Sequence, residues 1–197
     1  MFACPVGTKE HESIVATLAK ASEVHAALLA IDATPGTPVQ YVPEFVPATG
    51  QVIRVWVCWR DPEKKFRVVD ARKWIQRSGT EEEMKAEWVF AGSSFWLDPS
   101  DGREYYQADG GDMICVSNFS TALLDVTISS SAEADQLQFV PYEERIPEIG
   151  TPVRLILVPV PNPTDDPEAK PKFDPNQLPG DDVLPPVKGA APVAASK

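Results

Sequence analysis

Alternation of apolar and polar residues is clearest between residues 52 and 60, where it predicts a β-strand. One side of this segment carries apolar residues at every second position: Ile53, Val55, Val57 and Trp59. The other side carries Arg54, Trp56, Cys58 and Arg60. Side chains two residues apart share a strand face, so we place the first set in the core and expect the arginine-bearing face to be wetter. Turn residues at 61–64 and an apolar segment at 66–69 then predict a hairpin.

One helix is predicted over about residues 21–32. Val24, Leu28 and Ile31 fall at spacings that place them on one helical face. Ser22 is the predicted N-cap, because its hydroxyl can accept a hydrogen bond from a first-turn amide. The Thr34–Pro35 step disfavours helical geometry, so the helix ends before it.

Short strands are predicted along most of the remaining chain, at residues 12–18, 87–90, 95–97, 105–106, 113–116, 124–128, 137–140 and 153–158. Residues 113–116 are apolar on both faces, which favours a central strand. Asp98-Pro-Ser-Asp-Gly102 predicts a hairpin turn, and one helical turn is predicted within 70–76. Many short strands and a single good helix indicate a β-dominated α+β fold, either an antiparallel sandwich or a partly closed barrel.

The composition changes near residue 158. Residues 1–158 are predicted to form one β-rich globular domain, and ten of the 20 prolines lie in residues 159–197. This last segment has six acids and four lysines, a net charge of −2. Proline withholds amides from any ladder, and the segment has few apolar side chains to offset the entropy of ordering. We therefore predict a disordered, acidic tail.

The net charge of −11 argues against nucleic acid and anionic membranes as partners. An exception is the segment 60–77, which contains seven basic and three acidic residues. Such a segment is typical of the solvated side of a hairpin, and a small anion is the alternative ligand. No apolar run approaches the roughly 18 residues that a membrane-spanning helix needs, and residues 1–7 do not resemble a signal peptide.

Candidate chemistry gathers at Cys4–Ser13, which holds Cys4, His11 and two carboxylates. A zinc or copper site would need a third ligand to approach in space, and the candidates are His25 and Cys115. A thiol–imidazole pair of Cys4 and His11 is a second hypothesis. The spacing matches no zinc module, so a structural or surface role is the alternative for these residues. The sequence contains no complete catalytic or nucleotide-binding motif.

Four segments resemble the YdjY-type domain family: Lys9–Ser13, Val24–Val39, Trp88–Ser93 and Ala108–Asp112. The resemblance covers about residues 2–158. Members are usually exported bacterial proteins, and in some the domain lies beside a ferredoxin-like cluster domain. The resemblance therefore implies an exported or periplasmic protein. It also implies a further extended segment before residue 2, so we expect an unpaired strand edge beside residues 2–7 that could support a homo-oligomer.

We interpret the chain as a non-enzymatic, exported binding or interaction domain whose ligand is a protein or a small molecule. A metal- or thiol-dependent site around Cys4 and His11 is the alternative. An enzyme acting on a small anion near residues 60–77 is a third hypothesis.

Overall fold

The computed structural model describes residues 1–130, 138–162 and 172–186. The single α-helix in this part of the chain is α1 (Ala21–Ala30). The strands are β1 (Ala3–Pro5), β2 (Val15–Thr17), β3 (Val52–Arg60), β4 (Phe66–Asp70), β5 (Ile75–Arg77), β6 (Trp88–Phe90), β7 (Phe95–Leu97), β8 (Glu104–Tyr106), β9 (Leu124–Val126), β10 (Phe139–Pro141) and β11 (Val153–Pro159). Short 3-10 helices occupy Glu10–Glu12, Ala71–Trp74, Gln107–Gly110, Glu143–Arg145 and Asp181–Val183.

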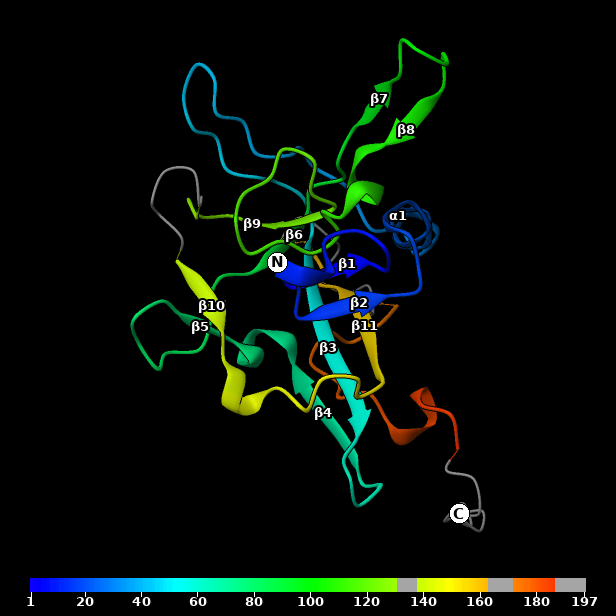
Figure 1. The fold of residues 1–197 in the computed structure, drawn as a ribbon, viewed down its shortest axis with the longest axis vertical. Helices are drawn as coiled ribbons and strands as arrows, with labels where there is room; N and C mark the ends of the chain where they lie inside the picture. The colour runs from blue at the N-terminus through cyan, green and yellow to red at the C-terminus, as the bar shows by residue number, and fades with distance from the viewer. Residues whose placement is uncertain (131–137, 163–171, 187–197) are drawn as a thin grey trace.

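β3 organises the main sheet, in which the order is β11-β3-β6-β9 and β4 also pairs with β3 (Figure 1). β11 runs antiparallel to β3 along seven residues, from Val153 opposite Trp59 to Pro159 opposite Ile53. The pairs β1-β2, β10-β5 and β7-β8 form three smaller sheets. None of these sheets closes into a barrel, so the predicted β-dominated α+β fold with one helix is confirmed in its sandwich-like form.

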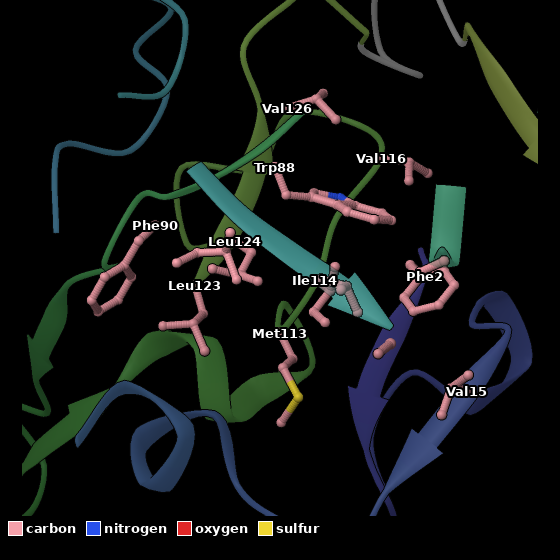
Figure 2. Packing of buried hydrophobic residues seen from close by; sticks show 14 of the residues in the cluster. Phe2, Val15, Trp88, Phe90, Met113, Ile114, Val116, Leu123, Leu124 and Val126 are labelled. Carbon is pink, nitrogen blue, oxygen red and sulfur yellow. The ribbon is translucent and has the colours of Figure 1, made fainter. Parts of the chain in front are cut away.

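The core packs between this sheet and the N-terminal strands (Figure 2). Trp88 is 1% exposed and lies 5.3 Å from the Phe2 ring between centroids. Its indole Nε1 donates a hydrogen bond of 2.7 Å to the Cys115 carbonyl oxygen. The buried indole therefore satisfies its one polar group while it contributes a large apolar surface.

The predicted helix and hairpins are present with adjusted ends. The predicted N-cap at Ser22 was wrong: α1 begins after Lys20, which is the N-cap, and the backbone and hydroxyl of Ser22 both donate to Asp109 at 2.8 Å. The 61–64 turn joins β3 to β4, and the 98–102 turn joins β7 to β8. The latter hairpin projects from the body of the molecule (Figure 1), and Trp96 on it is 49% exposed, so this tryptophan is not a core residue.

One predicted strand does not form, and another is shorter than predicted. Residues 113–116 are buried, but they make only single bridges, from Ile114 to Ala3 and to Leu124. Of residues 12–18 only Val15–Thr17 form a strand, and Leu18 is 97% exposed. In residues 113–116 the apolar pattern reflects burial rather than strand pairing. In residues 12–18 the alternation extends beyond the three residues that pair with β1.

The edge expected beside residues 2–7 is occupied at its beginning. Ile114 binds Phe2 and Ala3 through backbone hydrogen bonds, and Val15 donates to Phe2. β1 therefore has neighbours on both sides there, and homo-oligomer formation stays a prediction. Among the described residues no helix is long and apolar enough to span a membrane.

The predicted disordered tail also stays a prediction, because residues 163–171 and 187–197 lie outside the described residues. Residues 172–186 are described. They lie beside β3 and β11 (Figure 1). Asp181 forms an ion pair with Arg60.

Candidate binding groove

A groove of about 940 Å³ lies between the N-terminal segment and the chain around β10. Apolar side chains from distant parts of the sequence line it: Met1, Ile14, Ile75, Val116, Phe119, Phe139, Val140, Ile146 and Ile149. Its volume is in the range of ligand sites, roughly 300–1,000 Å³. We call this feature the acidic groove, because four glutamates also line it.

These glutamates are Glu10, Glu12, Glu143 and Glu148, and all four are exposed. No ion pair holds any of them within the described residues. The positive group in the lining is the Met1 ammonium, which donates to the Glu12 carbonyl at 2.7 Å. Carboxylates above an apolar surface create a negative potential that attracts cationic ligands.

The nearby basic side chains are turned toward other partners. Lys9 binds Asp112 at 2.7 Å, and its ammonium lies 4.8 Å from the centre of the Phe119 ring. Arg145 stacks on Tyr142 and pairs with Glu83. Neither cation lines the groove or forms an ion pair with its glutamates among the described residues. Burial would lower the pKa of Lys9, but Asp112 and also Glu12 raise it, so Glu12 is partly compensated by Lys9.

A buried carboxylate supports the Phe119 side of the groove. Asp125 has no exposed surface and accepts hydrogen bonds from the backbone amides of Phe119 at 3.1 Å and Val126 at 2.8 Å. Burial raises the pKa of Asp125 to about 7, and the Asp112 carboxylate adds to the rise, although the backbone amides oppose it. The position of Phe119 is therefore tied to an acid that titrates near neutral pH.

Cys4 and His11 lie in different environments. Cys4 is in β1 with no exposed surface, whereas His11 is exposed in the Glu10–Glu12 turn and lines the acidic groove. The structure records no hydrogen bond between the two side chains. The proposed thiol–imidazole pair therefore has no geometric support.

His25 and Cys115 are packed residues. The His25 Nδ1 lies 2.7 Å from the Tyr106 hydroxyl, which donates onward to the Gly92 carbonyl. Burial lowers the pKa of His25, which favours its neutral form. Burial and the nearby carboxylates of Asp125 and Asp112 hold the pKa of Cys115 well above its ordinary value. The thiolate required of a nucleophile or a metal ligand is thus disfavoured at Cys115.

The candidate metal ligands do not come together. No three His, Cys, Asp or Glu side chains gather around a metal-sized position in the described part of the chain. Asp109 instead binds Ser22, and Asp112 binds Lys9 and Thr121, so the turn at 109–112 has structural partners. Zinc or copper binding at Cys4, His11, His25 or Cys115 remains an untested prediction.

The basic segment 60–77 runs from the end of β3 through β4 to the end of β5. Three of its four arginines pair with carboxylates: Arg60 with Asp181, Arg67 with Asp61, and Arg72 with both Asp70 and Glu87. Arg77 has no ion pair among the described residues. Arg67 is half exposed, but the Arg60 and Arg72 side chains are 19% and 17% exposed, so only part of the segment is a solvated hairpin side. It offers no cluster of unpaired arginines for a small anion.

Comparison with protein families places this geometry in context. The family model of the YdjY domain matches residues 1–158. The chain belongs to the YdjY domain family. No curated protein and no solved structure matches it. All residues that line the acidic groove fall inside the YdjY domain, whereas residues 172–186 lie beyond it.

Sequence reasoning found His11 and its two neighbouring glutamates but missed the opposite side of the groove. Glu143, Glu148 and Ile149 follow a short strand in a proline-containing stretch, which has no periodicity to mark it. A signal was present in Ile149. It is a large apolar residue among acids and glycine, and it is fully exposed in the structure.

Proposed function

We propose that this YdjY domain is a non-enzymatic binding domain that holds a basic polypeptide segment with apolar side chains in the acidic groove. The observation that carries the proposal is the lining itself. Four exposed glutamates, none of which has an ion-pair partner among the described residues, line an apolar surface of ligand-site volume. Apolar burial would supply most of the affinity, and the carboxylates would select positive charge.

The strand beside the groove favours a polypeptide over a small cation. All three residues of β10 line the groove, and β10 pairs only with β5 in the described structure. An edge strand offers backbone groups to an extended segment, which is how many domains bind peptides by strand addition, although in this three-residue strand Pro141 contributes a carbonyl and no N–H. A polyamine would use the carboxylates but would leave the strand edge and the apolar surface without a partner. As the family's usual export implies, we place this binding outside the cytoplasm, and fractionation of the producing cells tests that location.

Fluorescence anisotropy tests the binding. A labelled peptide of alternating lysine and leucine should bind the full chain, and a peptide of alternating glutamate and leucine should not. Glu12→Gln and Glu148→Gln should each weaken binding about two- to fivefold, the range for exposed charge pairs. Added salt should weaken binding further.

The matched control is Glu144→Gln. Glu144 is an exposed neighbour of Glu143 in the same 3-10 helix, but it does not line the groove. Its substitution should leave the affinity unchanged. Equal binding of the two peptides, or an equal loss from Glu144→Gln, would refute the proposal.

A further inference from the structure

The outer face of the main sheet is buried although its sequence is partly charged. Alternate residues of β3 share a face, so Arg54, Trp56, Cys58 and Arg60 lie opposite the core residues Ile53, Val55 and Val57. Trp56 is 8% exposed and Cys58 is 0% exposed. Some part of the molecule must therefore cover a face that the alternation assigns to solvent.

Contacts from residues 172–186 reach this face. Arg60 Nη2 lies 2.5 Å from an Asp181 carboxylate oxygen. Arg154, which stands opposite Cys58 in the β3-β11 ladder, donates to the Val183 carbonyl. Both arginines point to the same side as Cys58, because directly paired residues of neighbouring strands share a face.

The segment is ordered against the domain at its other end as well. Lys172 lies 3.7 Å from an Asp32 carboxylate oxygen, and Pro175 is buried. Residues 172–186 hold one lysine and three aspartates, a net charge of −2, which complements the arginines of the sheet. Four of the 15 residues are prolines.

One hydrogen bond joins the two sides directly, from the Arg154 guanidinium to the Val183 carbonyl oxygen. Arg54 Nε, Trp56 Nε1 and Arg60 Nε are buried without a partner among the described residues, so residues 172–186 do not pair these three groups. A proline-rich backbone offers carbonyl acceptors but few N–H groups, and extended proline segments bind aromatic-lined surfaces at low entropic cost.

We propose that the outer face formed by Trp56, Cys58, Arg60 and Arg154 is a recognition surface for an acidic, proline-rich segment, and that residues 172–186 of the same chain are its occupant. This surface lies outside the acidic groove and does not depend on the function proposed for it. An acidic proline-rich segment of another molecule would have to displace the tethered one.

Alkylation of Cys58 reports whether the face is covered. Burial raises the pKa of Cys58 to about 11, although the Arg154 guanidinium opposes the rise, so the covered thiol is unreactive. In the full chain, residues 172–186 are replaced by a glycine-serine segment of the same length. Alkylation of Cys58, followed by peptide mapping, should accelerate about tenfold or more, which corresponds to about 1.4 kcal/mol of protection. Cys4 and Cys115, both fully buried in the domain, serve as internal references whose rates should not change.

A charge exchange tests the specific contact. Asp181→Arg should accelerate alkylation of Cys58 about two- to fivefold, and Arg60→Asp in the same chain should restore the protection. Asp182→Arg is the matched control, because Asp182 is the exposed neighbour and has no ion pair in the described residues. An equal effect of Asp182→Arg would overturn the assigned contact.

A synthetic peptide of residues 172–186, added to the glycine-serine variant, should slow alkylation of Cys58, and a scrambled peptide should not. Unchanged protection in the glycine-serine variant would overturn the proposal. Equal slowing by both peptides would overturn sequence recognition. Protection of the unmodified chain that falls on dilution would overturn the assignment to the same chain, because it would identify a second copy as the source.

Discussion

Asp125 should make the stability of this domain fall as the pH rises from about 4 to about 7. Its pKa is raised from 3.8 to about 7, chiefly because the carboxyl is buried. The folded chain therefore binds this proton more tightly than the unfolded chain does. The associated stability is fully present below pH 3.8, declines as the pH approaches the folded-state pKa, and is absent above it.

The magnitude follows from the size of the shift. A rise of about 3 pKa units corresponds to about 4 kcal/mol, at about 1.4 kcal/mol per unit. Asp125→Asn removes the proton equilibrium but retains one oxygen to accept from Val126. It replaces the acceptor of the Phe119 amide by an amide donor, at a cost of about 1 kcal/mol. The stability difference between the variant and the wild type should therefore shift by about 3 kcal/mol in favour of the variant between pH 5 and pH 8.

Urea denaturation followed by tryptophan fluorescence at pH 5, 6, 7 and 8 measures this difference. The difference is informative because His25 and Asp70 have lowered pKa values and give the opposite pH dependence in both proteins. Asp182→Asn, which changes an exposed acid, should remain parallel to the wild type. Parallel curves for Asp125→Asn would refute the reasoning, since they would show that Asp125 is not the proton-binding group.

Two further substitutions test the backbone and the ion pairs by the same denaturation assay. Gly50→Ala should lower the free energy of unfolding by at least about 2 kcal/mol, because Gly50 has φ +135° and a Cβ would lie 2.2 Å from the Phe90 carbonyl oxygen. Gly102→Ala is the control, since Gly102 has φ +69° and open space around it, and it should lower this free energy by only about 1 kcal/mol. Equal losses would contradict the close approach at Gly50. Asp70→Ala should lose about 3 kcal/mol at pH 7, because it leaves Arg54 and Arg72 without their shared partner. Burial would raise the pKa of Asp70, but hydrogen bonds from Arg72 and Arg54 outweigh it and lower that pKa, so the loss should shrink as the pH falls below 3.8; a constant loss would contradict the ion-pair explanation.

Local sequence signals predicted the elements that depend on neighbouring residues. The β3-β4 hairpin and helix α1 each follow from an apolar pattern and from turn or helix-ending residues nearby, although the cap predicted at Ser22 is not the one that forms. The turn at Ala71–Trp74 also lies where one helical turn was predicted. The segment 113–116 lies between two neighbours, as predicted for a central strand, but it forms no strand because each pairing is a single bridge at Ile114. The Ile114 amide donates to Ala3, and the Cys115 amide donates to Leu124. Hydrophobicity predicts that such a segment is buried, but it does not predict which residues its backbone pairs with.

The acidic groove was half predictable for the same reason. The local density of titratable groups around His11 predicted a metal or thiol site there. Their role changes once Glu143, Glu148 and Ile149 are placed opposite them across an apolar surface. A separation of more than 130 residues carries no periodic signal, so only the fold brings the two sides together.

The contact between the outer sheet face and residues 172–186 was not predicted, because the sequence of each segment was interpreted separately. Arginines on alternate positions of β3 indicate a wet face, and ten prolines after residue 158 indicate a segment without a core. Each interpretation leaves out the other segment as a possible partner. Placed together, the face offers the positive charges of Arg60 and Arg154, and residues 172–186 offer the Asp181 carboxylate and the Val183 carbonyl. A segment that is too polar to fold alone can therefore still cover Trp56 and Cys58, because the sheet provides the apolar and donor groups that the segment lacks.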